Sequence, residues 1–155
     1  MTPNDKTIIA FPDVRKGNVR IKSFDNNNYD HVFVCCESLV ACLKFNNEGT
    51  LLATASEKVF KHYNFIKGTI IRIFRVSDGT FLHEVRRGKK TAKIHDISFN
   101  TNSYLITCIS DHGTVHIFSL GTIKEKLMSI KKGESNFEIK EDEPELPTQK
   151  SSLYK

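Results

Sequence analysis

The sequence has no apolar run long enough to cross a bilayer, for which about 20 consecutive apolar residues are needed. It also shows no secretory signal, because residues 1–6 are polar and Pro12 and Asp13 soon interrupt the short apolar stretch behind them. Both absences argue against a membrane-spanning or secreted chain. We therefore expect a cytosolic protein.

The sequence has four cysteines and no Cys-x-x-Cys pair. Such pairs are typical of zinc sites and of redox-active disulfides. In a cytosolic protein, cysteines outside such motifs are expected to stay reduced. We therefore expect Cys35, Cys36, Cys42 and Cys108 to be free thiols, mostly packed in strands.

Acidic side chains are scarce over residues 1–133, which carry 20 basic and 12 acidic side chains and hence a net charge of +8. Residues 134–145 have the opposite balance, with six acidic side chains and one lysine. The basic part favours an anionic partner, either a membrane or a nucleic acid. Ordinary solubilising charge is the alternative explanation, and composition alone does not decide between them.

Helical patterning is also absent from the first 120 residues. Alternating apolar and polar residues with many β-branched side chains predict short strands instead. The expected strands are residues 18–23, 31–36, 40–45, 51–55, 69–75, 80–85, 94–99, 104–109 and 114–120. Turn-forming residues separate them, as at 46–49, 77–79, 100–103 and 111–113. This pattern predicts an all-β fold.

An internal repeat relates two parts of the chain. The residues from Val40 to Ser56 match those from Ile94 to Ser110, Gly68-Thr69 matches Gly113-Thr114, and Arg72-Ile73-Phe74 matches His116-Ile117-Phe118. The copies differ by one residue in the last strand and by an insertion at 59–67. A repeat of about 40–45 residues that contains several short strands is typical of β-propeller blades.

Two consecutive arginines lie between the repeats, in Val85-Arg86-Arg87-Gly88. Adjacent residues of a strand point to opposite sides, so the two guanidinium groups can serve two different pockets. Each pocket would contain an arginine, Ser/Thr hydroxyls and a second cationic or imidazole group. Guanidinium forks suit phosphate, so this pattern predicts two anion-binding sites.

These residues resemble the PROPPIN family of WD-repeat-like β-propellers, which bind phosphoinositides. The resemblance covers about residues 11–120 and depends on an ordered set of motifs: 53–58, 68–69, 71–74, 86–88, 92–94 and 97–99. It implies an all-β fold, with about two four-stranded blades of a seven-bladed propeller and a disordered C-terminal tail. The expected divisions are a remnant of a preceding blade (1–30), a blade ending in Arg-Arg-Gly (31–88), the following blade (89–120) and a charged loop or tail (121–155).

Two blades do not close a ring, and repeat units generally need neighbours to bury their faces. Either the chain is a fragment of a larger product, which we favour, or it pairs with another chain.

The resemblance also implies two phosphoinositide sites. The first would be formed by Ser56, Thr69, Arg72 and Arg86, and the second by Arg87, Ser110, Thr114 and His116. We expect His116 to add positive charge at mildly acidic pH, since its unperturbed pKa is about 6.5. Without the family pattern, the hydroxyls would be read as turn caps, and Arg72 and His116 as exposed strand residues.

Three departures from the family pattern bear on these sites. Val85 replaces the phenylalanine of Phe-Arg-Arg-Gly, Cys36 stands where a histidine usually contributes to the first site, and the 59–67 insertion is unusual. We therefore expect these departures to affect the first site more than the second. Residues 123–132, with the apolar Ile123, Leu127 and Ile130, form either a short basic amphipathic element that enters the membrane or an ordinary charged linker.

The family resemblance implies that the chain binds phosphatidylinositol 3-phosphate and phosphatidylinositol 3,5-bisphosphate. Its expected role is membrane recruitment in autophagy and in endosomal or vacuolar traffic, with autophagy proteins as possible partners. The alternative function is a protein-interaction scaffold whose lipid sites have degraded.

Other functions find little support in the sequence. We expect no catalysis, cofactor, metal or small-molecule substrate: His112 and His116 are not on a helix face, and Cys108 with His95 lacks a third orienting group. Nucleic-acid binding would need stacking aromatics beside the basic residues. The repeat-equivalent aromatic residues are instead expected in the core: Phe45, Phe74, Phe99 and Phe118.

Overall fold

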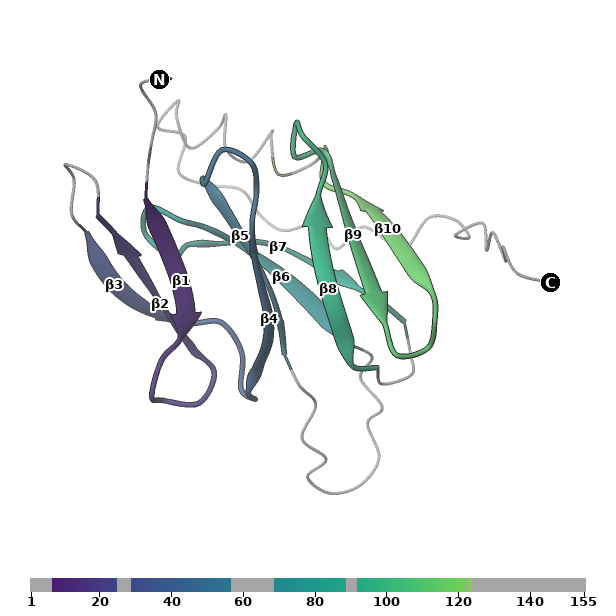
Figure 1. Cartoon of the computed structure of the whole chain (residues 1–155), viewed down its shortest axis with the longest axis horizontal. Coiled ribbons are helices and arrows are strands. Elements are labelled where there is room, and N and C mark those ends of the chain that lie inside the picture. The colour runs from purple at the N-terminus through teal and green to yellow at the C-terminus, as the bar shows by residue number, and fades with distance from the viewer. Residues whose placement is uncertain (1–6, 25–28, 57–68, 89–91, 122, 124–155) are drawn as a thin grey trace, which may run out of the picture.

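The computed structural model describes residues 7–24, 29–56, 69–88, 92–121 and 123, and forms three antiparallel sheets from ten strands within them (Figure 1). Sheet 1 contains β1 (Ile8–Pro12), β2 (Asn18–Ser23) and β3 (Asp30–Val34). Sheet 2 contains β4 (Val40–Phe45), β5 (Leu51–Ser56), β6 (Ile70–Arg75) and β7 (Phe81–Arg86). Sheet 3 contains β8 (Ile94–Phe99), β9 (Leu105–Ser110) and β10 (Val115–Ser119). The all-β prediction is confirmed.

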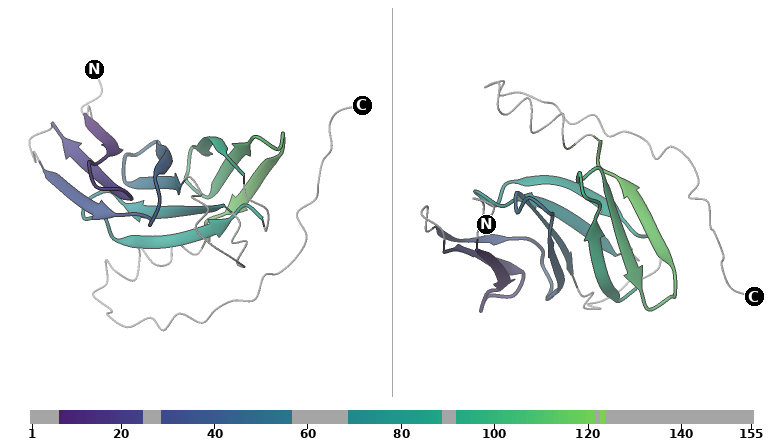
Figure 2. Two further views of the ribbon diagram at one scale, coloured as in Figure 1. Left: turned by 90° about the horizontal axis from the view of Figure 1, so that it is seen from below. Right: turned by 45° about the horizontal axis from the view of Figure 1, so that its top comes forward.

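Strands pair in chain order within each sheet, as expected for blades built from consecutive hairpins. The three sheets follow one another side by side, with sheet 2 in the middle (Figure 2). Within the described residues, no helix is both long and apolar enough to cross a membrane.

Two apolar cores hold the sheets together. One side of sheet 2 packs on sheet 1, where Leu52 and Phe74 contact the cluster around Val19 and Ile21. Its other side packs on sheet 3, where the fully buried Ile71 belongs to a second cluster. Alternate residues of β5 and β6 therefore serve different cores, and this explains why both strands are buried on two sides. Burial of this kind is the main stabilising force in such a stack.

The internal repeat is visible in the hydrogen bonding. Asn46 Oδ1 accepts hydrogen bonds from the backbone amides of Thr50 and Leu51. At the equivalent place in the second repeat, Asn100 Oδ1 accepts a hydrogen bond from the backbone amide of Leu105. The register of β4 on β5 and that of β8 on β9 also shift at equivalent places, between residues 40 and 42 and between 94 and 96. Sheets 2 and 3 are therefore two copies of one supersecondary unit.

The border between sheets 1 and 2 differs from the expected division after residue 30. Strand β3 pairs with β2 as far as Val34, so sheet 1 continues to that residue. The amides of Cys35 and Cys36 then donate to the Gly17 carbonyl, at 2.8 and 3.2 Å, and the chain turns towards β4. Strand β1, which was not expected from the sequence, is short and ends at Pro12 on the edge of the sheet.

Other expectations fall partly or wholly outside the described residues. The 59–67 insertion and most of the charged loop or tail expected at 121–155 are among them. Ile123 itself is described, and it is 2% exposed in the core between sheets 2 and 3. Our suggestion that Ile123 belongs to a membrane-entering face is therefore wrong, because its side chain is already used in packing.

Candidate anion-binding site

The two arginines leave sheet 2 on opposite sides, where β7 ends. Val85 pairs with Ile71 and is buried towards sheet 3, whereas Arg86 is exposed on the other side. Arg87 follows the direction of Val85 and is only 6% exposed. Because successive residues of an extended chain point to opposite sides, the two guanidinium groups lie on opposite sides of sheet 2.

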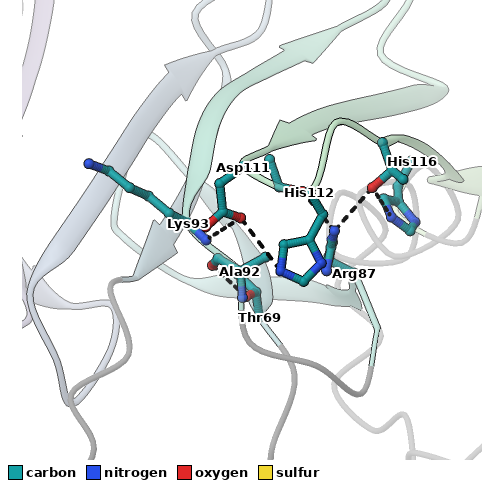
Figure 3. Close-up of polar contacts among 9 residues, drawn as sticks. Thr69, Arg87, Ala92, Lys93, Asp111, His112 and His116 are labelled. Atoms are coloured by element: carbon teal, nitrogen blue, oxygen red, sulfur yellow. Dashed lines mark hydrogen bonds and ion pairs between the residues drawn. The ribbon is translucent and has the colours of Figure 1, made fainter.

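The four residues expected in the second site are joined through Arg87; Figure 3 labels Arg87 and His116. Its Nη2 donates hydrogen bonds to Ser110 Oγ at 2.7 Å and to Thr114 Oγ1 at 3.0 Å. Thr114 Oγ1 lies 3.2 Å from His116 Nε2. Ser110 is buried, His116 is half-buried and Thr114 is exposed, so the network leads from the interior to the surface.

One donor of this network has no acceptor among the described residues. Arg87 Nε is buried and makes no hydrogen bond there. A buried N–H of a charged group without a partner is costly, by about 1–3 kcal/mol or more. An anion that reached Arg87 from the Thr114 side would find a guanidinium group and a hydroxyl already positioned.

The electrostatics at His116 differ from our expectation. Burial lowers the pKa of His116 below its usual 6.5, and the positive charge of Arg87 lowers it further. A smaller fraction of His116 is therefore protonated at a given mildly acidic pH than its unperturbed pKa implies, so less positive charge is added there than we expect from the sequence. Burial raises the pKa of Cys108, its cross-strand neighbour, so this thiol stays protonated and is a poor nucleophile.

The lowered pKa of His116 predicts a pH-dependent stability. Below pH 6.5 the unfolded chain takes up a proton at this residue before the folded protein does. The free energy of unfolding should therefore fall as the pH drops from 6.5 towards the folded pKa, and His116→Gln should remove that part of the fall. Urea unfolding between about pH 7.5 and pH 5 measures it. Parallel curves for the two proteins would contradict the assignment.

Residues on either side of the loop after Arg87 extend this region, and their mutual contacts were not expected from the sequence. The Lys93 amide donates to Asp111 Oδ1 at 3.1 Å, and His112 Nε2 lies 3.8 Å from the same oxygen (Figure 3). Thr69 Oγ1 both donates to the Ala92 carbonyl, at 2.9 Å, and accepts from the Ala92 amide, at 3.1 Å. These bonds attach the end of sheet 2 to the start of sheet 3.

Thr69 does not lie with the other residues expected in the first site. It precedes β6 and follows the same alternation as Ile71, which faces sheet 3, and its hydroxyl bonds Ala92 there. The reason is the one-residue difference between the repeats. When Arg72 is aligned with His116, the residue at the Thr114 position is Ile70.

Arg72, Ser56 and Arg86 lie on the opposite side of sheet 2. Arg72, however, pairs with residues outside this set. Arg72 Nε lies 3.4 Å from Glu84 Oε2, and its Nη1 donates to the Cys35 carbonyl at 3.4 Å. Among the described residues, no hydrogen bond joins Arg72, Ser56 and Arg86 to one another. The first site is therefore less assembled than the second.

Cys36 adds a further difference at the first site. Cys35 Sγ donates to Cys36 Sγ at 3.6 Å, and this bond lowers the pKa of Cys36 to about 6, with a smaller contribution from the charge of Arg72. The pKa of Cys35 is raised by the same pairing. The lowered pKa makes a negative charge on Cys36 easier to form near Arg72, and such a charge would repel an incoming anion.

The remaining expectations concern thiols, metal and aromatic residues. All four cysteines are free, and three of them are buried. In the described part of the chain, no group of three or more His, Cys, Asp or Glu side chains is placed to hold a metal ion. The four repeat-equivalent phenylalanines pack in or against the two cores, as expected: Phe45, Phe74, Phe99 and Phe118.

Comparison with known proteins agrees with this architecture. The PROPPIN family model matches residues 4–137. Autophagy-related protein 21 of Pichia angusta is 41% identical over 62% of this chain and 22% of its own length. Autophagy-related protein 18 of Phaeosphaeria nodorum is 48% identical over 54% of this chain and 18% of its own length. The chain thus spans about a fifth of these relatives.

Solved structures of Hsv2 share the fold. The Kluyveromyces lactis Hsv2 structure with complete loop 6CD superposes with a TM-score of 0.64, at 20% identity, over 83% of this chain and 41% of that protein. Hsv2 of Kluyveromyces marxianus gives a TM-score of 0.60 at 23% identity, over 75% of this chain and 34% of that protein. The predicted propeller segment is confirmed.

Proposed function

Because this chain belongs to the PROPPIN family, we propose that it binds phosphoinositides and recruits autophagy machinery to membranes. The proposed ligands are phosphatidylinositol 3-phosphate and phosphatidylinositol 3,5-bisphosphate. The proposed places of action are the membranes of autophagosomal precursors, endosomes or vacuoles, which a cytosolic protein reaches by peripheral binding. In this role the chain is an adaptor and not an enzyme.

The observation that supports this proposal most is the arrangement at Arg87. A buried guanidinium group is held by the hydroxyls of Ser110 and Thr114, and its Nε has no acceptor among the described residues. A phosphate group offers several acceptor oxygens in the geometry that a guanidinium fork suits. Thr114 and His116 lie beside Arg87 towards the surface, where a phosphorylated inositol ring would also contact them.

Liposome sedimentation tests the proposal with three vesicle compositions. The first contains phosphatidylinositol 3-phosphate, the second phosphatidylinositol 3,5-bisphosphate, and the third enough phosphatidylserine to match the charge of the others. We expect stronger sedimentation with either phosphoinositide than with phosphatidylserine. Equal binding to all three would mean simple charge attraction, and the proposed specificity would then be wrong.

Ion pairing at Arg72 gives a second prediction. Glu84 neutralises part of the Arg72 charge on the side of sheet 2 proposed for the first site. Glu84→Gln should therefore strengthen phosphoinositide binding by about fivefold, the equivalent of one charge, or about 1 kcal/mol, near an anionic surface. Asp78→Gln is the matched control, because Asp78 pairs with Arg75 at the other end of the sheet. The same gain in both variants would contradict a local effect.

The alternative function, a protein-interaction scaffold with degraded lipid sites, has one observation in its favour. Arg72 already pairs with Glu84 and donates to the Cys35 carbonyl. Such contacts are expected of an arginine that stabilises the fold and does not bind a ligand. This function predicts capture of a partner protein without lipid and no dependence on Arg86 or Arg87. Binding assays with the arginine variants described below distinguish the two functions.

A further inference from the structure

Cys35 and Cys36 form a pair of adjacent thiols in the segment that joins β3 to β4 (Figure 1). Within a strand, neighbouring side chains point to opposite faces, which would keep two such thiols apart. Here the strand ends at Val34, and the amides of both cysteines donate to the Gly17 carbonyl. Both side chains therefore enter the core between sheets 1 and 2, and their sulfur atoms lie 3.6 Å apart.

The contacts of the pair give the two sulfur atoms different roles. Cys35 Sγ donates a hydrogen bond to Cys36 Sγ, and Cys36 Sγ donates to the Ser38 carbonyl at 3.0 Å. The hydrogen bond from Cys35 lowers the pKa of Cys36, and the positive charge of Arg72 lowers it further. The thiolate is the reactive form of cysteine, so Cys36 is the better nucleophile. Cys35 already contacts the Cys36 sulfur and is placed to react with it in a second step.

Burial limits the oxidants that suit this pair. Cys35 is 4% exposed and Cys36 is 8% exposed, so a compact oxidant fits better than a bulky disulfide. Hydrogen peroxide is compact and oxidises thiolates. Cys42 and Cys108 belong to the other core, between sheets 2 and 3, and burial raises the pKa of both. They are therefore expected to react more slowly.

We propose that Cys35 and Cys36 form a redox modification site, at which hydrogen peroxide converts the two thiols into a disulfide. In the first step the Cys36 sulfur attacks one peroxide oxygen. An S–O bond forms, the O–O bond breaks, and the other oxygen leaves as water with the Cys36 proton. In the second step the Cys35 sulfur attacks the Cys36 sulfenic acid. An S–S bond forms, the S–O bond breaks, and the hydroxyl group leaves as water with the Cys35 proton.

The disulfide is expected to be reversible. Adjacent Cα atoms are about 3.8 Å apart, whereas the Cα atoms of most disulfide-linked cysteines are about 4.4–6.8 Å apart. A bridge between neighbouring residues closes a short, strained ring, and strained disulfides are the ones that are reduced most easily. A thiol reductant should therefore restore the pair.

The pair also contacts the side of sheet 2 proposed for the first site. Arg72 Nη1 donates to the Cys35 carbonyl, so a change in this segment reaches that arginine. The inference itself does not depend on lipid binding, because the reaction between the thiols and peroxide needs no lipid.

Peptide mapping tests the proposal. The folded chain is treated with a small excess of hydrogen peroxide and denatured, and its remaining thiols are alkylated with iodoacetamide. Trypsin and a glutamate-specific protease then separate the pair from Cys42, because Glu37 lies between them. We expect the peptide that contains Cys35 and Cys36 to lose two hydrogen atoms and to escape alkylation, whereas Cys42 and Cys108 are alkylated. Dithiothreitol added before the alkylation should restore both thiols.

The rate of oxidation provides a second readout. We expect the pair to react at least about tenfold faster than Cys42 or Cys108, because a difference of one pKa unit changes the thiolate fraction about tenfold. Equal rates for all four cysteines would mean general accessibility and would overturn the proposal. So would a wild-type pair that keeps two free thiols while Cys42 or Cys108 is oxidised.

Serine variants separate the roles of the two sulfur atoms. Cys35→Ser should stop at the sulfenic acid on Cys36, which dimedone traps, and Cys36→Ser should leave Cys35 unmodified at the same dose. Cys42→Ser is the matched control and should form the disulfide like the wild type. Circular dichroism confirms folding of each variant, and the wild-type peptide map decides alone if a variant unfolds. Sulfenic acid on Cys35 in Cys36→Ser, at the rate seen for Cys36, would contradict the assigned roles.

Discussion

Arg87→Met is expected to weaken binding to phosphatidylinositol 3-phosphate liposomes by at least about tenfold, because hydrogen bonds from a charged donor contribute about 1.5–3 kcal/mol. The methionine fills a similar volume but donates nothing, and the hydroxyls of Ser110 and Thr114 lose their common donor. Arg86→Met removes an exposed charge and should weaken binding by about fivefold. The double variant should lose detectable sedimentation.

Arg75→Met is the matched control for this series. Arg75 also lies in sheet 2 and is ion-paired, but it bonds Asp78 and Thr80 at the end of the sheet away from Arg87. We expect its liposome binding to equal that of the wild type, after circular dichroism has shown that every variant folds. Undiminished binding by the Arg86/Arg87 double variant would rule out both proposed sites. An equal loss with Arg75→Met would mean that only net charge matters.

Gly17→Ala is expected to lower the free energy of unfolding by about 3 kcal/mol or more, the upper end of the cost of a strained backbone position. Gly17 has a φ of +78°, which side chains other than hydrogen disfavour. Any Cβ built there also overlaps the carbonyl oxygen of Cys36. The turn of sheet 1 would have to move away from Cys35 and Cys36, whose amides bond the Gly17 carbonyl.

Gly113→Ala separates the two causes. Gly113 has a similar φ of +65°, but a Cβ there would meet nothing within 4 Å. Its substitution should cost only the backbone strain, about 1–2 kcal/mol. Urea unfolding of both variants measures the difference, with the slope of the transition as the check on two-state behaviour. Equal losses would show that the contact with Cys36 does not limit this turn.

The chemistry at Arg87 was predictable from the sequence because it depends on local rules. Alternation along a strand determines that Arg86 and Arg87 leave the sheet on opposite sides. Ser110 and Thr114 were singled out by the family resemblance, since their hydroxyls alone would be read as turn caps. Their proximity to Arg87 follows from short hairpins, because the order of the strands in each sheet is their order in the chain.

The first site was less predictable, because its composition depends on register. A difference of one residue between the repeats moves Thr69 to the side of Arg87, although Thr69 and Thr114 look equivalent in sequence. The partner of Arg72 was likewise invisible, since Glu84 becomes its cross-strand neighbour only when β6 pairs with β7. Both threonines follow a glycine and match the same motif, but the strand register gives their hydroxyls different partners.

The sequence by itself determined the all-β fold, the repeat, the opposite directions of the two arginines and the burial of the phenylalanines. All of these depend on periods of two residues or on turn-forming residues, which act over a few positions. Only the tertiary structure decided that sheet 1 continues to Val34, that Ile123 is buried and that the pKa of His116 is lowered. Those features depend on which surfaces meet, because burial and neighbouring charge arise only when separate sheets pack together.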